Sequence, residues 1–231
     1  MKILGVKIDP VDYQETIEKI GEFIVSQNPH HLVTLNPEMI VTAQKDREFK
    51  RILNDSDLNT PDGFGIRLAL KKIHHLSLQE NVTGVDLTYK LADISQTKKW
   101  KIYLVGAGRG IAQKTAKNLL KKYPKARIVG ATQEPDLDDI KKKKPDIFLL
   151  AFGPPKQEKW IYEHKNELKI PVTIGVGGTF DYISGKIKRA PKWMRTLGLE
   201  WLYRLIQQPS RAPRIFNAVV KFPLLVLFSK K

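Results

Sequence analysis

Short apolar runs of strand length alternate along most of this chain with amphipathic stretches of helical period. Alternation of this kind is typical of parallel strands joined by crossover helices. The apolar runs cover residues 2–8, 31–36, 100–106, 126–131, 146–153 and 171–178. They predict an α/β fold, a Rossmann-like, doubly wound and mostly parallel sheet that carries a helical, membrane-associating appendage at its C-terminus.

The segments between the predicted strands favour helices. Tyr13, Ile17 and Ile20 lie on one face of the first. Pro37 suits the first turn of a helix predicted over residues 37–53, and another helix is predicted over residues 111–122. The lysine-rich stretch that follows residue 131 is interpreted as solvated, with turn and N-cap roles for the acids of "EPDLDD".

Positive charge is concentrated near the C-terminus. The chain has 40 Lys and Arg against 24 Asp and Glu, a net charge of +16, and from residue 183 onward eleven Lys and Arg face the single acid Glu200. The composition changes near Arg189, so we expect an α/β core over residues 1–195 and a basic, amphipathic appendage over residues 196–231. Such an excess favours an anionic partner, which is a nucleic acid, a phosphorylated substrate or an acidic membrane surface.

The arrangement of this charge favours an anionic membrane surface. The basic residues are mixed with long aliphatic side chains, and no nucleic-acid-binding module is apparent, so we expect no nucleic-acid partner. Residues 215–228 are too short to span a bilayer, and Lys221 and Pro223 interrupt them. The alternative is that these residues pack as ordinary terminal helices or form the interface of a homo-oligomer.

Cysteine usage and the first residues bear on localisation. The absence of cysteine suits a reducing cytosol, and no signal peptide is expected. Together with the basic appendage, these features predict a cytoplasmic protein held peripherally on the inner face of the cell membrane.

Ligands of doubly wound sheets bind at the carboxyl ends of the strands. The polar and glycine residues at the predicted ends are therefore candidate binding residues: Thr34, Asn36, Gly106, Gly108, Arg109, Gln157, Gly178 and Asp181. "VGAGRG" resembles a turn that cradles a phosphate, but Ile111 stands where a dinucleotide fingerprint has its third glycine. A nucleotide or diphosphate ligand, a plain tight turn and an NAD-dependent oxidoreductase remain open for this turn.

Asp62 is the candidate catalytic residue. It lies between a proline and two glycines in "TPDGFG", where a predicted strand leads into a helix. One interpretation is that Asp62 caps that helix. The other is that it acts as a general base, because the neighbouring glycines leave room for a substrate hydroxyl.

Two further loops have structural and functional interpretations. Gln157 follows the two prolines of "FGPPKQEKW", which make either a rigid turn or a support for a ligand. "GVGGTFD" allows a base or ribose to approach the backbone, or forms a β-bulge. No histidine spacing suggests a metal site, and we expect neither a metal nor a cofactor.

Taken in order, several motifs resemble the WecG/TagA/CpsF family of bacterial glycosyltransferases, with the TagA-like N-acetylmannosaminyltransferases of wall teichoic acid synthesis as the most similar branch. They cover nearly the whole chain and are "TLNPEMI", "TPDGFGI", "VTGVDL", "YLVGAGRG", "FGPPKQEKWI", "GVGGTFDYISGKIKRAPKWM" and "GLEWLYRL".

The resemblance implies an inverting, metal-independent hexosyltransferase. Its donor would be UDP-N-acetylmannosamine, its acceptor N-acetylglucosamine on undecaprenyl diphosphate, and another UDP-sugar such as the uronic acid remains an alternative. The resemblance makes Asp62 the base, gives Thr34 and Gln157 sugar and nucleotide contacts, and lets Arg204, Arg211 and Arg214 complete the site. The chain departs from the family at Asn81, where relatives often carry Arg.

Overall fold

A six-stranded sheet forms the centre of the computed structural model, which describes residues 1–229. All neighbouring strands run parallel, in the order β4-β3-β8-β7-β5-β6. The strands are β3 (His30–Leu35), β4 (Leu58–Pro61), β5 (Lys101–Gly106), β6 (Arg127–Thr132), β7 (Ile147–Ala151) and β8 (Val172–Gly175). This confirms the predicted α/β fold.

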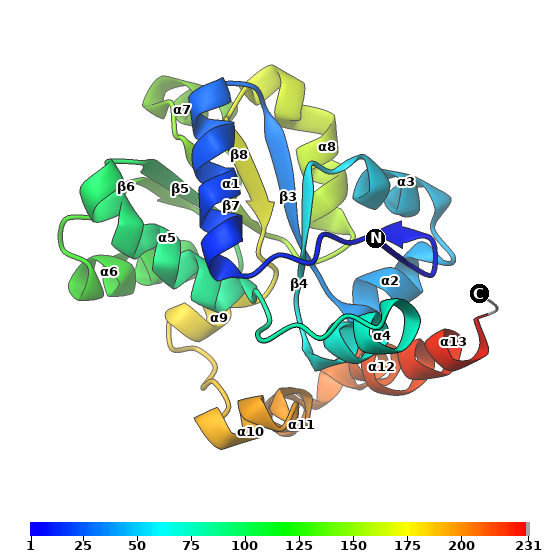
Figure 1. Ribbon diagram of the computed structural model, residues 1–231. Helices are drawn as coiled ribbons and strands as arrows, with labels where there is room; N and C mark the ends of the chain where they lie inside the picture. The colour runs from blue at the N-terminus through cyan, green and yellow to red at the C-terminus, as the bar shows by residue number, and fades with distance from the viewer. Residues whose placement is uncertain (230–231) are drawn as a thin grey trace.

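Helices cover both faces of the sheet (Figure 1). One face packs against α1 (Tyr13–Ser26), α5 (Gly84–Lys98), α6 (Ile111–Lys122) and α9 (Thr179–Ile183). The other face packs against α2 (Pro37–Ala43), α3 (Arg47–Asp55), α4 (Phe64–His74), α7 (Leu137–Lys143) and α8 (Lys156–Leu168). Successive strand side chains alternate between the faces, so Leu32 lies in one core cluster and Val33 in the other.

The first apolar run does not join the sheet. β1 (Lys2–Ile3) and β2 (Val6–Lys7) form a separate antiparallel hairpin. The two residues of its turn, Leu4 and Gly5, both have positive φ (51° and 77°), as a tight hairpin turn requires.

Two local predictions need correction or refinement. The single helix predicted over residues 37–53 is two helices, because Asp46 starts a new one by accepting a hydrogen bond from the Phe49 amide (2.9 Å). The lysine-rich stretch includes a helix, α7. Its N-cap is Asp136, which accepts from the Asp139 amide (3.0 Å) and so confirms the capping role expected there.

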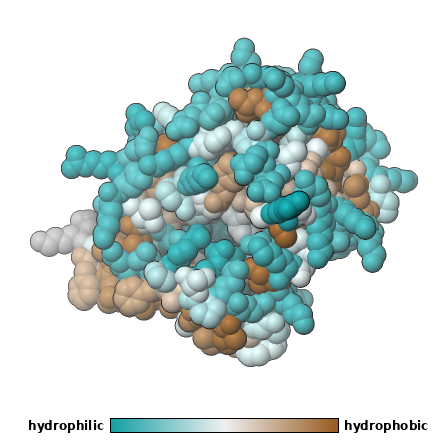
Figure 2. Space-filling model, turned by 180° about the vertical axis from the view of Figure 1, so that it is seen from behind, coloured by the Kyte–Doolittle hydropathy of each residue, from teal (hydrophilic) through white to brown (hydrophobic). Residues whose placement is uncertain are grey.

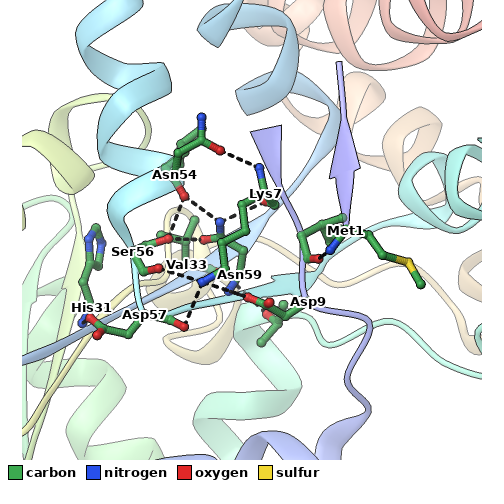
Figure 3. Close-up of polar contacts among 12 residues, drawn as sticks. Met1, Lys7, Asp9, His31, Val33, Asn54, Ser56, Asp57 and Asn59 are labelled. Carbon is green, nitrogen blue, oxygen red and sulfur yellow. Dashed lines mark hydrogen bonds and ion pairs between the residues drawn. The ribbon is translucent and has the colours of Figure 1, made fainter. Parts of the chain in front are cut away.

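A buried polar network ties the hairpin to the sheet, as Figure 3 shows. Asn59 of β4 is fully buried and donates to the carbonyls of Lys7 (2.9 Å) and Leu53 (2.6 Å). Its amide oxygen accepts from Ser56 Oγ (2.6 Å). Because every polar atom of this amide has a partner, burial of Asn59 fixes the hairpin against α3 and β4.

The C-terminal elements run along the carboxyl ends of β3, β4 and β8 (Figure 1). They are α10 (Lys192–Thr196), α11 (Glu200–Gln207), a 3₁₀ turn (Pro209–Arg211), α12 (Ala212–Phe216), a π-helical stretch (Asn217–Lys221) and α13 (Phe222–Phe228). The predicted helical appendage is thus present, and its final two lysines lie outside the described residues.

The appendage is anchored in the core. Phe222 and Val226 are buried in the same cluster as Met39 of α2 and Ile66 of α4. α13 therefore shares a core with helices of the sheet domain. The domain boundary expected at residue 195 stays a prediction. Among residues 1–229, no helix is both long and apolar enough to cross a membrane.

Candidate active site

A cavity of about 410 Å³ opens at the carboxyl ends of the strands. β3 and β8 are neighbours in the sheet, but β4, which follows β3, lies on one side of this pair, and β7, which precedes β8, lies on the other. The strand order therefore reverses between β3 and β8, and open α/β sheets bind ligands at such a reversal. Loops after β3, β4, β5, β7 and β8 line the cavity together with α11, the 3₁₀ turn and α12. The predicted residues that line it are Thr34, Asn36, Asp62, Gly108, Gln157, Gly178, Asp181, Arg204, Arg211 and Arg214.

Asp62 lies in this cavity between β4 and α4. The helix is capped by Gly63, whose φ of +103° suits glycine, and no side chain caps it, so the capping interpretation of Asp62 is wrong. Burial raises the pKa of Asp62 to about 7, and the Glu200 carboxylate adds to the rise while Arg189 opposes it. A carboxyl with a pKa near neutrality, beside a cavity, is suited to general-base chemistry.

Thr34 and Asn36 have structural hydrogen bonds as well as cavity positions. Thr34 Oγ1 donates to the carbonyl of Gly175 (3.1 Å) and so joins β3 to β8. Asn36 caps α2, because its Oδ1 accepts from the Met39 amide (3.1 Å). These bonds fix the end of β3 at the cavity.

Gln157 connects the loops that follow two neighbouring strands. Its Oε1 accepts from the backbone amides of Gly153, after β7, and Gly177, after β8, both at 3.0 Å. Its Nε2 donates to Oε1 of the fully buried Glu158 (2.6 Å), whose pKa burial raises to about 8. A methyl group at Gly175 would lie 2.5 Å from this nitrogen, so the hydrogen bonds of Gln157, here called the Gln157 clamp, need glycine at that position.

In the glycine turn after β5, one glycine allows close strand packing and another borders the cavity. Gly106 has a φ of +112°, and a Cβ there would lie 2.9 Å from the Ala151 backbone, so close strand packing requires glycine. Gly108 borders the cavity, whereas Gly106 and Arg109 do not. Arg109 is exposed.

Three arginines approach the cavity from the C-terminal elements. Arg204 lies over the ring of Tyr182 (4.7 Å to the centroid), and its Nε and Nη2 are buried without a hydrogen-bond partner among residues 1–229. Arg214 Nε donates to Glu38 Oε1 (2.6 Å). Burial and the charges of Arg204 and Arg214 lower the pKa of Arg211. A buried guanidinium group without partners, as in Arg204, fits an anionic ligand.

Several cavity residues were not predicted from the sequence. Arg189 binds Asp86 through both terminal nitrogens (2.6 Å each) and lies 3.5 Å from the Glu200 carboxylate. Lys186 pairs with Asp181 at 3.3 Å. In the sequence Arg189 and Lys186 were indistinguishable from the rest of the basic C-terminal region, and only the path of the chain after α9 brings them to the cavity.

The last two observations concern Asn81 and metal binding. Asn81, where relatives often carry Arg, does not line the cavity, and its Oδ1 is buried without a hydrogen-bond partner in the described chain. Within residues 1–229, no group of three or more His, Asp or Glu side chains is arranged to hold a metal ion.

Comparison with known proteins identifies similar chains. The model of the "Glycosyl transferase WecG/TagA/CpsF family" matches residues 1–231. A protein of Bacillus subtilis (strain 168) is 35% identical over 97% of this chain and 86% of its own length. One of Staphylococcus aureus (strain MW2) is 31% identical over 92% of this chain and 87% of its own. Both carry the name N-acetylglucosaminyldiphosphoundecaprenol N-acetyl-beta-D-mannosaminyltransferase, and neither comparison favours an oxidoreductase.

Proposed function

Because the chain belongs to the WecG/TagA/CpsF family of glycosyltransferases, we propose that it transfers N-acetylmannosamine from UDP to N-acetylglucosamine on undecaprenyl diphosphate. The names of the relatives support this acceptor and this sugar. The product would serve the synthesis of a cell-wall polymer such as teichoic acid. The single observation that carries the chemistry is the Asp62 carboxyl, which has a pKa near 7 and lies in the cavity at the carboxyl ends of the strands.

The proposed reaction is a single inverting displacement. Asp62 removes the proton from the acceptor hydroxyl, and the hydroxyl oxygen forms a bond to the anomeric carbon of the donor. The bond from that carbon to the diphosphate of UDP breaks on the opposite face, and UDP leaves with the electron pair. Asp62 holds the proton until solvent takes it.

Charge develops on the departing diphosphate. Arg204 borders the cavity and has no carboxylate partner within 4 Å among residues 1–229. Guanidinium groups bind phosphate oxygens through two parallel hydrogen bonds and remain charged at any physiological pH. Held in place before the reaction, such groups stabilise the transition state without having to reorganise.

We also propose that the protein lies on the anionic inner face of the cell membrane. Phe216, Val220, Leu224 and Phe228 follow one another at four-residue spacing and are exposed, although Phe222 and Val226 on the other side of the same helical run are buried. Figure 2 shows apolar groups along the lower edge of the molecule. An apolar helix face beside basic residues is typical of interfacial binding.

In this orientation the appendage receives the acceptor. Arg211 and Arg214 belong to the same C-terminal run as the exposed apolar face and also border the cavity. A lipid whose chain stays in the bilayer therefore presents its diphosphate to these arginines and its sugar to Asp62.

The function is tested by product formation. The full chain is incubated with a lipid-diphosphate-linked N-acetylglucosamine acceptor and, in separate reactions, UDP-N-acetylmannosamine, its uronic acid and UDP-N-acetylglucosamine. We expect UDP release and a disaccharide-lipid only with UDP-N-acetylmannosamine. Transfer from the UDP-linked uronic acid instead would show that this sugar nucleotide is the donor. No transfer from any of the three would refute the function.

A further inference from the structure

Besides the three arginines of the appendage, two cations border the cavity, and both come from the segment that links α9 to α10. Arg189 is paired with Asp86, and the other cation is Lys186. Its Nζ lies 3.3 Å from Asp181 Oδ1 and would lie 3.8 Å from a Cβ on Gly108, in the turn after β5. Lys186 therefore lies between α9 and the glycine turn, whereas Arg204, Arg211 and Arg214 reach the cavity from α11 and the helical run after it.

The backbone around Lys186 is fixed by local hydrogen bonds. The Ile187 amide donates to the Asp181 carbonyl (3.0 Å), and Ser184 Oγ donates to the same carbonyl (3.2 Å). The side chain of Lys186 is nevertheless 49% exposed, so its ammonium group remains accessible to a ligand. The backbone thus holds the charge near the cavity while the side chain retains freedom to turn.

The glycine turn itself supplies no other cation to the cavity. Arg109 is exposed outside it. Gly108 carries no side chain that would keep an anion from the backbone there, and Ala107 and Gly108 both line the cavity. An anionic group bound at this turn meets Lys186 as its counter-charge.

The reaction brings two diphosphates into one cavity, that of the donor nucleotide and that of the lipid acceptor. Two diphosphates in the same cavity repel each other, so each diphosphate needs its own cations. Resting on the proposed function, we infer that Lys186, together with Arg204, binds the diphosphate of the UDP-sugar donor at the turn after β5, while Arg211 and Arg214 serve the lipid diphosphate. Asp181 holds Lys186 in position until the nucleotide binds.

Binding of UDP and of uridine to the full chain, measured by titration calorimetry, tests this inference. We expect Lys186→Gln to weaken UDP binding about tenfold to a hundredfold, the cost of losing a hydrogen bond to a charged group, and to leave uridine binding unchanged. Lys186→Arg should restore most of the affinity for UDP. Lys188→Gln is the matched control, because Lys188 carries the same charge two residues away but does not border the cavity.

Each outcome has a distinct meaning. If Lys186→Gln binds UDP as tightly as the unchanged protein, or loses UDP and uridine equally, the inference is wrong. If the unchanged protein binds no UDP, the proposed function fails first. In steady-state assays, Lys186→Gln should raise KM for the donor and leave KM for the lipid acceptor unchanged, and the reverse pattern would overturn the assignment.

Discussion

Asp62 is subject to opposing influences on its charge. Burial and the nearby Glu200 disfavour the carboxylate, and Arg189 favours it. Arg189 is itself neutralised by Asp86, so little of its charge is left to lower the pKa of Asp62. The resulting value of about 7 keeps Asp62 basic enough to take a proton and still ionised in part of the population at neutral pH.

This balance predicts the pH dependence of the reaction. The folded protein keeps Asp62 protonated below about pH 7, so kcat/KM should rise as the pH increases through that value and then level off. Glu200→Gln removes the repulsion and leaves Arg189 with one carboxylate fewer, so both effects should move the midpoint to lower pH. A flat profile between pH 6 and 8, or an unmoved midpoint in Glu200→Gln, would contradict this account of Asp62.

Residue types and their order were enough to locate much of the cavity, because polar residues after parallel strands must gather at one edge of a sheet. Asp62 and Asp181 were found in this way. The partners of Gln157 could not be found, since they are backbone amides of Gly153 and Gly177 that only the adjacency of β7 and β8 brings together. The position of Lys186 at the cavity could not be predicted for a related reason, because it lies in a connecting segment whose path the sequence does not specify.

At the scale of elements, Gln157 sets the spacing of the β7–α8 and β8–α9 loops. Gln157→Ala leaves two backbone amides and Glu158 without this partner, at a cost of about 1–3 kcal/mol for each buried group that stays unpaired. We expect a lower melting temperature and a clear loss of transfer activity. Gln14→Ala on α1 is the control, because Gln14 is an exposed helical glutamine whose side chain donates to Glu18 of the same helix.

The outcome that would contradict the clamp is a Gln157→Ala protein with unchanged stability and activity. If stability falls but donor affinity and kcat remain, Gln157 contributes to folding alone and has no part in shaping the cavity.

The elements that sequence patterns failed to predict share a physical cause. The break between α2 and α3 depends on the Asp46 cap, which also receives Lys159 of α8 at 2.9 Å, a contact made only in the folded chain. The hairpin at residues 2–7 depends on two positive φ angles and on Asn59, which lies 52 residues from Lys7 along the chain. Local periodicity carries no information on contacts of that range.

At the scale of the molecule, one helical run has two apolar faces with different neighbours. Phe222 and Val226 pack in the core beside α2 and α4, so deleting the appendage would open that core and confuse loss of folding with loss of membrane binding. Leu224 and Phe228, on the exposed face, are 47% and 81% exposed and are better positions for a test.

We expect the double substitution Leu224→Glu and Phe228→Glu to abolish sedimentation with anionic liposomes while leaving the melting temperature nearly unchanged, because charge is added where the protein is exposed. Val25→Glu is the control, since Val25 is 83% exposed on α1 and lies outside the appendage. Unchanged sedimentation of the double variant would refute the membrane orientation proposed for the C-terminal helices.

The most direct measurement compares the unchanged protein with Asp62→Asn for transfer to the lipid acceptor and for UDP binding in parallel. Asparagine cannot take the proton, so transfer should fall at least about a hundredfold while UDP still binds. Raising the pKa of Asp62 above its unfolded value costs stability as the pH rises from about 4 to 7, so Asp62→Asn should be no less stable than the unchanged protein at pH 8. A folded, UDP-binding Asp62→Asn protein that keeps most of its transfer activity would show that Asp62 is not the base.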